Sequence, residues 1–260
     1  MKEKKRADQI LFDRKTVESR AKAKALIMAG QVEYRIPGKD WIKLEKAGSL
    51  FVEEVEFKLK EVNPYVSRGA QKLLGAFEQW PFLESAVENK IALDIGASTG
   101  GFTQVLLEKG ASKVVAIDVG RNQLHEKLKS DERVLSCEKT HILKTDQSFW
   151  SGISIEPSFP FVVTDVSFIS LKKIIVHVKQ YLEKGAYWVM LVKPQFELNP
   201  NKVPKGIVRS QDDRQLALDS VKEICQSNDF EVIGDCESPI QGQAGNVEYL
   251  LLTKFIGGLS

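Results

Sequence analysis

The sequence predicts an α/β protein whose main part is a doubly wound, largely parallel sheet, preceded by a small α+β unit. Apolar runs at residues 91–95, 113–118, 161–165 and 186–192 alternate with helical patterns, as parallel strands alternate with crossover helices. A glycine-rich turn follows the first of these runs. The first 60 residues differ, because they combine two short helical patterns with several short strand patterns. We therefore expect two structural units.

Length and composition support a globular protein. A chain of 260 residues has room for one large and one small domain, and 28% of its residues are charged. No apolar run approaches the ~20 residues that span a bilayer, and the N-terminus leads into no apolar signal-peptide core. Three cysteines, at positions 137, 225 and 236, have no metal-ligand spacing. We expect a reduced, cytoplasmic protein without a metal site.

The net charge of +2 conceals an asymmetry along the chain. Residues 1–75 carry 17 Lys and Arg against 11 Asp and Glu, a net charge of +6, whereas residues 76–260 have a net charge of −4. Segregated positive charge is typical of a segment that meets a polyanion.

The N-terminal elements begin with a helical pattern over residues 6–14. Ser19 is placed to cap a second helix that runs to Ala29 and stops at Gly30. The pattern turns Ala25, Leu26 and Met28 inward and projects three basic residues, Arg20, Lys22 and Lys24. These three form either a binding face for a polyanion or an ordinary solvated face. Residues 31–60 then predict short strands, with turns at 37–38 and 48–49.

The glycine-rich turn at residues 93–103 predicts a nucleotide-type ligand. The motif reads strand, tight turn and helix, so backbone N–H groups can face a ligand closely. Asp118 ends the next strand, where a carboxylate can accept hydrogen bonds from a ribose diol. The spacing is not the dinucleotide G-x-G-x-x-G, and Asp94 suits a cationic ligand, which favours S-adenosylmethionine. A glycine turn in some other α/β protein is the alternative.

Three further charged residues lie within apolar strand patterns or at their ends. Asp165 ends the run at 161–165, at the sheet edge where such folds bind ligands. Pro194 keeps Lys193 out of the helical region, at the tip of its strand. Glu248 interrupts an apolar strand expected at 246–252, where an unpaired carboxylate is costly. A helix cap for Asp165 and a surface position for Lys193 are the plain alternatives.

The N-terminal motifs resemble a known RNA-binding domain. The string Arg6-Ala7-Asp8-x-x-Leu11, followed by Ser19-Arg20-x-x-Ala23-x-x-Leu26-Ile27-x-x-Gly30, is similar to the domain first seen in ribosomal protein S-four. The turn usual in that domain, Val-Asn-Gly, is replaced here by Glu33-Tyr34-Arg35. The resemblance implies that Arg6 and the basic residues of the second helix contact RNA.

The whole chain resembles the TlyA family, whose members are known both as hemolysins and as ribosomal RNA 2′-O-methyltransferases. Two strings carry the likeness, Tyr65-Val66-Ser67-Arg68-Gly69-Ala70-Gln71-Lys72-Leu73 and the glycine stretch 94–103. The resemblance implies a Rossmann-like S-adenosylmethionine-dependent methyltransferase sheet, FtsJ-like, of seven strands with the last one antiparallel. It also implies an RNA-binding domain at 1–61, a linker at 62–69 and a catalytic domain at 70–260.

The resemblance assigns candidate site residues. The catalytic set is Lys72, Asp165, Lys193 and Glu248: Lys193 is the candidate base, Asp165 orients it, and Lys72 and Glu248 position the ribose. A lysine acts as a base only where burial or neighbouring cations favour its neutral form. The cofactor set is Asp94, Gly96, Ala97, Ser98, Thr99, Gly100, Gly101, Phe102, Asp118, Val119 and Asp165. The RNA-binding set is Arg6, Arg20, Lys22, Lys24 and Arg68.

The expected activity is methylation of a ribose 2′-hydroxyl in ribosomal RNA, at a cytidine. Two other functions stay open, a membrane-active hemolysin and a non-catalytic ribosome assembly factor. The sequence contains no long amphipathic apolar helix that would support the first. The loop at 199–209, rich in turn formers and cations, is either a substrate gate or a solvated connection.

Overall fold

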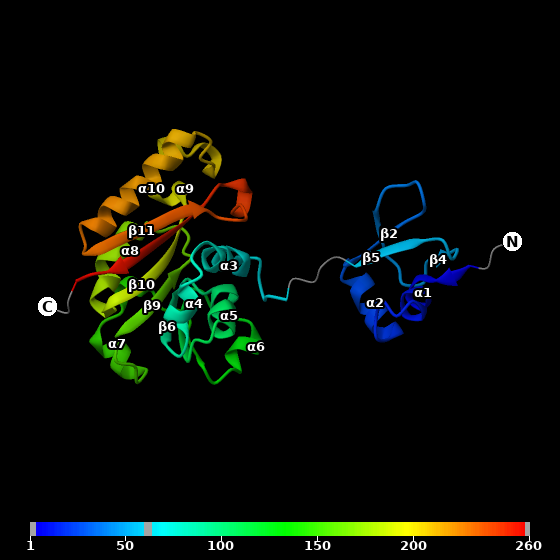
Figure 1. Ribbon diagram of the computed structural model, residues 1–260, viewed down its shortest axis with the longest axis horizontal. Helices are drawn as coiled ribbons and strands as arrows, with labels where there is room; N and C mark the ends of the chain where they lie inside the picture. Colours follow the sequence, from blue (N-terminus) through cyan, green and yellow to red (C-terminus); the bar gives the residue numbers. More distant parts are fainter. Residues whose placement is uncertain (1–3, 60–63, 258–260) are drawn as a thin grey trace. The chain divides into compact units, whose positions relative to one another are not determined.

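The computed structural model describes residues 4–59 and 64–257. The chain divides between Pro64 and Tyr65 into two units, each described here on its own (Figure 1). The linker expected at 62–69 falls across this division. Residues 60–63 lie outside the described residues, and 65–69 belong to the second unit.

Within residues 4–59 the first unit has two helices and five short strands. They are β1 (Lys5–Arg6), α1 (Ala7–Asp13), α2 (Arg20–Met28), β2 (Val32–Arg35), β3 (Ile42–Lys43), β4 (Leu50–Phe51) and β5 (Glu56–Leu59). Three strands form an antiparallel sheet in the order β3-β2-β5, and β1 pairs with β4. The side chain of Ser19 accepts a hydrogen bond from Lys22 N, which confirms the predicted N-cap of α2.

The buried face of α2 differs from the predicted one. Ala23 and Ile27 are buried at an i, i+4 spacing, whereas Ala25 is exposed and Met28 is 73% exposed, so the inward orientation expected for Ala25 and Met28 is wrong. With about 100° between successive residues, Arg20 and Lys24 lie about 40° apart around the helix axis, and Lys22 lies about 160° from both. The three cations therefore do not share one face.

The second unit is built on one seven-stranded sheet. Its strands are β6 (Ile91–Ile95), β7 (Lys113–Ile117), β8 (Val134–Cys137), β9 (Phe159–Thr164), β10 (Leu182–Val192), β11 (Phe230–Glu237) and β12 (Tyr249–Phe255). The order is β11-β12-β10-β9-β6-β7-β8. The last strand, β12, runs antiparallel to both of its neighbours, and the other pairs are parallel. This confirms the predicted sheet.

Helices cover both faces of this sheet (Figure 1). One face packs against α3 (Gly69–Gln79), α4 (Leu83–Val87), α5 (Gly101–Glu108) and α6 (Glu126–Lys129). The other packs against α7 (Gln147–Gly152), α8 (Leu171–Val178) and α10 (Gln211–Gln226). Ala92 and Leu93 are adjacent in β6 and enter opposite cores, as the two-residue period of a strand requires.

The connections contain one further helix and several short turns. These are α9 (Pro194–Glu197) and the 3₁₀ turns η1 (Ile142–Lys144), η2 (Lys179–Tyr181), η3 (Pro200–Lys202), η4 (Pro204–Gly206) and η5 (Gln243–Gly245). Helix α6 is shorter than the predicted 123–129, because the Glu138 carboxylate accepts backbone hydrogen bonds from Asn122, Gln123 and Leu124. None of the helices in the described part of the chain is long and apolar enough to cross a membrane.

Candidate active site

A cavity of about 620 Å³ opens at the carboxyl ends of β6, β9 and β10, within the second unit. This is the edge at which open α/β sheets bind their ligands. Most of the predicted site residues line it: Arg68, Lys72, Gly96, Ala97, Ser98, Thr99, Gly101, Phe102, Asp165, Lys193 and Glu248. Asp94, Gly100, Asp118 and Val119 are not among the lining residues.

Lys72 and Glu248 form a buried ion pair at the cavity wall. Lys72, on α3, is 8% exposed and Glu248 is 2% exposed. Lys72 Nζ donates a hydrogen bond to Glu248 Oε2 at 2.7 Å. The sequence placed Glu248 inside a strand, and this is wrong: β12 begins at Tyr249, so Glu248 ends the segment that enters the strand. Its burial is compensated by a lysine from another element.

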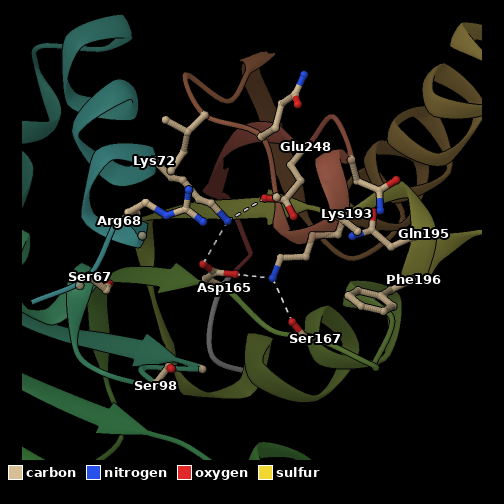
Figure 2. Close-up of a pocket in the computed structure, with 18 of the residues that line it drawn as sticks. Ser67, Arg68, Lys72, Ser98, Asp165, Ser167, Lys193, Gln195, Phe196 and Glu248 are labelled. Carbon is tan, nitrogen blue, oxygen red and sulfur yellow. Dashed lines mark hydrogen bonds and ion pairs between the residues drawn. The ribbon is translucent and has the colours of Figure 1, made fainter. Parts of the chain in front are cut away.

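Asp165 connects this pair to Lys193. Asp165 Oδ2 lies 3.7 Å from Lys72 Nζ, and Asp165 Oδ1 lies 2.6 Å from Lys193 Nζ. Lys193 Nζ also donates a hydrogen bond to Ser167 Oγ at 3.1 Å. Glu248, Lys72, Asp165 and Lys193 therefore form a chain of alternating charge, drawn with dashed lines in Figure 2. Such alternation lets charges be buried together, whereas removing one member leaves its neighbour unpaired.

Two glycines of the turn at residues 93–103 allow its backbone to lie close to Asp165 and to the segment before α3. Gly96 has φ +86°, and a Cβ there would lie 2.4 Å from the carbonyl oxygen of Asp165. A Cβ at Gly101 would lie 2.3 Å from Ser67 Oγ, so no larger residue fits at this position without a shift. Gly100 faces Leu128 instead of the cavity. The glycine turn, Asp165 and the segment before α3 are thus in close contact.

Asp118 fixes the shape of this turn. Its Oδ2 accepts a hydrogen bond from Ser98 N at 2.8 Å, and its Oδ1 accepts one from Gly120 N at 2.6 Å. Each carboxylate oxygen can accept a further bond, so these contacts leave capacity for a ligand hydroxyl. Val119, the next residue, is 67% exposed.

Asp94 is a fully buried carboxylate beneath the turn. Its Oδ2 accepts a hydrogen bond from Thr103 Oγ1 at 2.6 Å, and its Oδ1 has no hydrogen-bond partner among the described residues. Burial, helped by the negative charges of Asp165 and Asp118, raises the pKa of Asp94 to about 7. A cation bound near these carboxylates would favour the ionised form of Asp94. The ammonium and sulfonium groups of S-adenosylmethionine are positively charged, so they suit a site with these carboxylates.

An aromatic pair lines the cavity beside Lys193, and the sequence analysis did not identify it. Phe168 is 92% exposed, with φ +66°, an uncommon conformation for a residue with a side chain. Its ring centroid lies 5.2 Å from that of Phe196, which follows Lys193 by three positions. Large exposed aromatic side chains at a cavity are typical of ligand contact surfaces. The sequence signal for this pair is the string Lys193-Pro194-Gln195-Phe196, in which an aromatic residue closely follows the candidate base.

Asn246 fastens the loop at 199–209 to the segment that carries Glu248. Its Oδ1 accepts a hydrogen bond from Val208 N at 3.0 Å, and its Nδ2 donates one to Gly206 O at 2.8 Å. Its backbone carbonyl accepts one from Gly242 N at 2.9 Å. A Cβ at Gly242 would lie 2.1 Å from Glu248 Oε1. One end of the loop is therefore anchored, and a side chain at position 242 would displace the Glu248 carboxylate.

The predicted RNA-binding residues occur in both units. Arg68 is exposed and lines the cavity. In the first unit, Arg6 and Arg20 both contact the buried carboxylate of Asp8, at 2.9 Å and 3.2 Å. These contacts, that of Arg6 first, lower the pKa of Asp8. Both arginine side chains stay about half exposed, so Asp8 orients them without covering them.

Among the described residues, no group of three or more His, Cys, Asp and Glu side chains is arranged to hold a metal ion.

Comparison with known proteins gives consistent matches. The model of the family described as FtsJ-like methyltransferase matches residues 65–255. The chain is 38% identical to the protein named Hemolysin A of Brachyspira hyodysenteriae, over 94% of this chain and 98% of that one. It is also 38% identical to the 16S/23S rRNA (cytidine-2'-O)-methyltransferase TlyA of Mycobacterium tuberculosis, strain H37Rv, over 95% and 88%. Among solved structures, a hemolysin-named protein of Streptococcus thermophilus aligns with a TM-score of 0.72 at 37% identity, covering 99% of this chain and 90% of that one.

Proposed function

The chain belongs to the FtsJ-like methyltransferase family, and from this we propose that it methylates a ribose 2′-hydroxyl of ribosomal RNA, at a cytidine, with S-adenosylmethionine as the methyl donor. The single observation that carries the proposal is the charged chain of Glu248, Lys72, Asp165 and Lys193 beside the glycine turn. The relative named as a cytidine-2'-O-methyltransferase supports the choice of substrate.

Lys193 is the proposed proton acceptor for the ribose hydroxyl. Lys72 lies between two carboxylates, whereas the polar partners of Lys193 Nζ among the described residues are Asp165 and the neutral Ser167 hydroxyl. Of the two lysines, Lys193 is therefore the one held by fewer carboxylates, and we assign proton acceptance to it. Asp165 orients it, and the Lys72–Glu248 pair holds the ribose in position. General base catalysis of this kind contributes about 10²–10⁴-fold, and positioning supplies much of the rest.

Gly96 and its neighbours through Thr99, together with Asp94, are the residues proposed to hold the cofactor. Asp118 keeps this turn in shape and has spare acceptor capacity for a ribose diol. When bound there, S-adenosylmethionine supplies an activated methyl group. Gly96 permits close contact between the turn and the Asp165 backbone, and the Asp165 side chain contacts Lys193. The cofactor site and the proton acceptor are therefore held next to each other.

The first unit is proposed to hold RNA through its cations. Residues 1–64 carry 15 Lys and Arg against 11 Asp and Glu, a net charge of +4, and Arg6 and Arg20 are oriented by Asp8 with their side chains about half exposed. Phosphate contacts of this kind provide affinity and register without sequence information. We place this activity in the cytoplasm, where ribosomal RNA is folded and modified.

The decisive experiment is incubation of the purified protein with ribosomal subunits and methyl-labelled cofactor, followed by mapping of ribose methylation. We expect one or a few cytidines to acquire a 2′-O-methyl group with the natural protein and none with Lys193→Ala. Label in a base or in protein, and not in ribose, would contradict the proposal. Leakage of dye-loaded liposomes on addition of the protein would favour the membrane activity suggested by the hemolysin-named relatives.

A further inference from the structure

Gln195 has a buried amide oxygen that receives no hydrogen bond from any of the described residues. The residue is the second of α9, between Lys193 and Phe196, and it lines the cavity. Its Oε1 exposes less than 1 Å² and has no hydrogen-bond partner in the described part of the chain. Figure 2 shows Gln195 on the Lys193 side of the site, above Phe196.

An unsatisfied buried acceptor destabilises a folded protein, because the oxygen loses its water without gaining a donor. A leucine side chain of similar size would not carry this penalty. A glutamine that is unfavourable for folding and lies in the cavity indicates that a ligand supplies the missing donor.

The neighbouring side chains indicate which part of an RNA ligand this is. Phe196 and the 92% exposed Phe168 form an apolar surface next to the amide. Single bases of RNA are typically held in this way, stacked on aromatic rings and hydrogen-bonded along their edges. An amide oxygen accepts from an amino group, which cytosine has at its C4 position, whereas uracil has a carbonyl acceptor there.

We propose that the Gln195 amide turns its Oε1 toward the cavity when a nucleotide binds, that Oε1 then accepts a hydrogen bond from the exocyclic amino group of the target base, and that this contact favours cytidine over uridine. The inference rests on the proposed function, because it requires a nucleotide at the cavity. Gln195 is assigned to base selection, and proton acceptance remains with Lys193.

The test combines activity and stability for Gln195→Leu. Substrates are ribosomal subunits in which the nucleotide mapped for the natural protein is either cytidine or uridine. We expect the natural protein to prefer cytidine at least about tenfold in kcat/KM, and Gln195→Leu to bring this ratio close to one, mainly through weaker methylation of cytidine. Binding of S-adenosylhomocysteine should be unchanged. The melting temperature of Gln195→Leu should equal or exceed that of the natural protein.

Two further variants sharpen the test. Gln195→Glu retains acceptor oxygens and should keep most of the preference for cytidine. Gln226→Leu, at an exposed glutamine that ends α10, controls for the general effect of the substitution and should change neither ratio nor melting temperature.

Three results would overturn the inference: an unchanged cytidine preference in Gln195→Leu, a melting temperature clearly below that of the natural protein, or a mapped target without an amino group. Absence of ribose methylation by the natural protein is a different failure. It would reject the proposed function itself, and the base assignment would fall with it.

Discussion

Lys72 Nζ lies 2.7 Å from Glu248 Oε2, although the two residues are 176 positions apart in the chain. Both are almost completely buried, and Lys72 has one other carboxylate near it, that of Asp165 at 3.7 Å. A buried lysine without a close partner is costly, so the position of Glu248 determines the position of Lys72. Side chains that crowd Glu248 should therefore impair the site without contacting substrate.

Gly242→Ala tests this dependence. The added Cβ would lie 2.1 Å from Glu248 Oε1, so the carboxylate must shift, and this disturbs the hydrogen bond that its Oε2 accepts from Lys72. We expect a loss of about 1–3 kcal/mol in the free energy of unfolding and at least about a tenfold decrease in methyl transfer, with unchanged binding of S-adenosylhomocysteine. Denaturant unfolding and single-turnover assays measure the two effects. Gly152→Ala, where the new Cβ meets nothing within 4 Å, is the control. Full activity in Gly242→Ala would mean that the pair does not position the site.

Lys193→Ala removes the proposed proton acceptor. We expect methyl transfer to fall by about 10²–10⁴-fold, while affinity for S-adenosylhomocysteine stays within about twofold, because the proton is transferred only in the transition state. Lys184→Ala, an exposed lysine of β10, should leave the rate unchanged. A Lys193→Ala protein with the natural rate would eliminate Lys193 as the base.

The cofactor assignment predicts ligand-dependent stabilisation. At ~100 times its dissociation constant, S-adenosylhomocysteine should raise the free energy of unfolding by about 2.7 kcal/mol. Asp118→Ala should weaken this effect, because the variant loses both the acceptor and the two backbone bonds that shape the turn. Thermal unfolding at a series of ligand concentrations measures it, with exposed Asp212→Ala as the control. Stabilisation by NADH instead would refute the assignment.

The raised pKa of Asp94 predicts a specific pH dependence of stability. Its pKa is about 7 in the folded protein and about 3.9 in an unfolded chain, so folding binds a proton between these values. The stability that Asp94 contributes is fully present below about pH 4, falls as the pH rises to about 7, and is constant above that. Asp94→Asn can keep the hydrogen bond from Thr103 but cannot ionise. Its stability relative to the natural protein should therefore increase from pH 4 to pH 7 and then level off.

Thermal unfolding of both proteins from pH 4 to pH 9, without cofactor, checks this prediction. The difference between the two isolates Asp94 from the other carboxylates. Asp8, for example, has a lowered pKa and gives the opposite slope in both proteins. A difference that does not change with pH would show that Asp94 ionises normally.

The geometry of α2 refines the test of RNA binding. If Arg20, Lys22 and Lys24 all contact phosphates, their joint replacement by alanine should lower the slope of log affinity against log salt by roughly 0.7–0.9 for each residue. Arg20 and Lys24 share one side of the helix, so their double replacement should give most of this change and Lys22→Ala the least. Cofactor affinity should stay constant. An unaltered salt slope in the triple variant would move the electrostatic contact to Arg68 and the loop at 199–209.

The sheet of the second unit was predictable because its signals are local. A stretch of about ten residues is enough to recognise an apolar run, a glycine turn, or a strand-ending residue such as Asp165 or Lys193. The position of Glu248 was not predictable in this way, since its burial depends on Lys72 from a distant helix. The same holds for Asn246, whose partners are backbone groups of another loop. The orientation of α2 was misjudged because Met28 is as apolar as a buried residue, and only tertiary packing selected Ala23 and Ile27.

Glu248 is synthesised after the three other charged residues of the site. During translation, Lys72, Asp165 and Lys193 emerge before the segment that carries Glu248 and before β12, which inserts between β10 and β11. Until then Lys72 lacks its closest partner, and β11 has no neighbour in the sheet. A nascent chain can therefore form much of its sheet before Glu248 reaches Lys72. The four charged residues of the site come together only when β12 is in place.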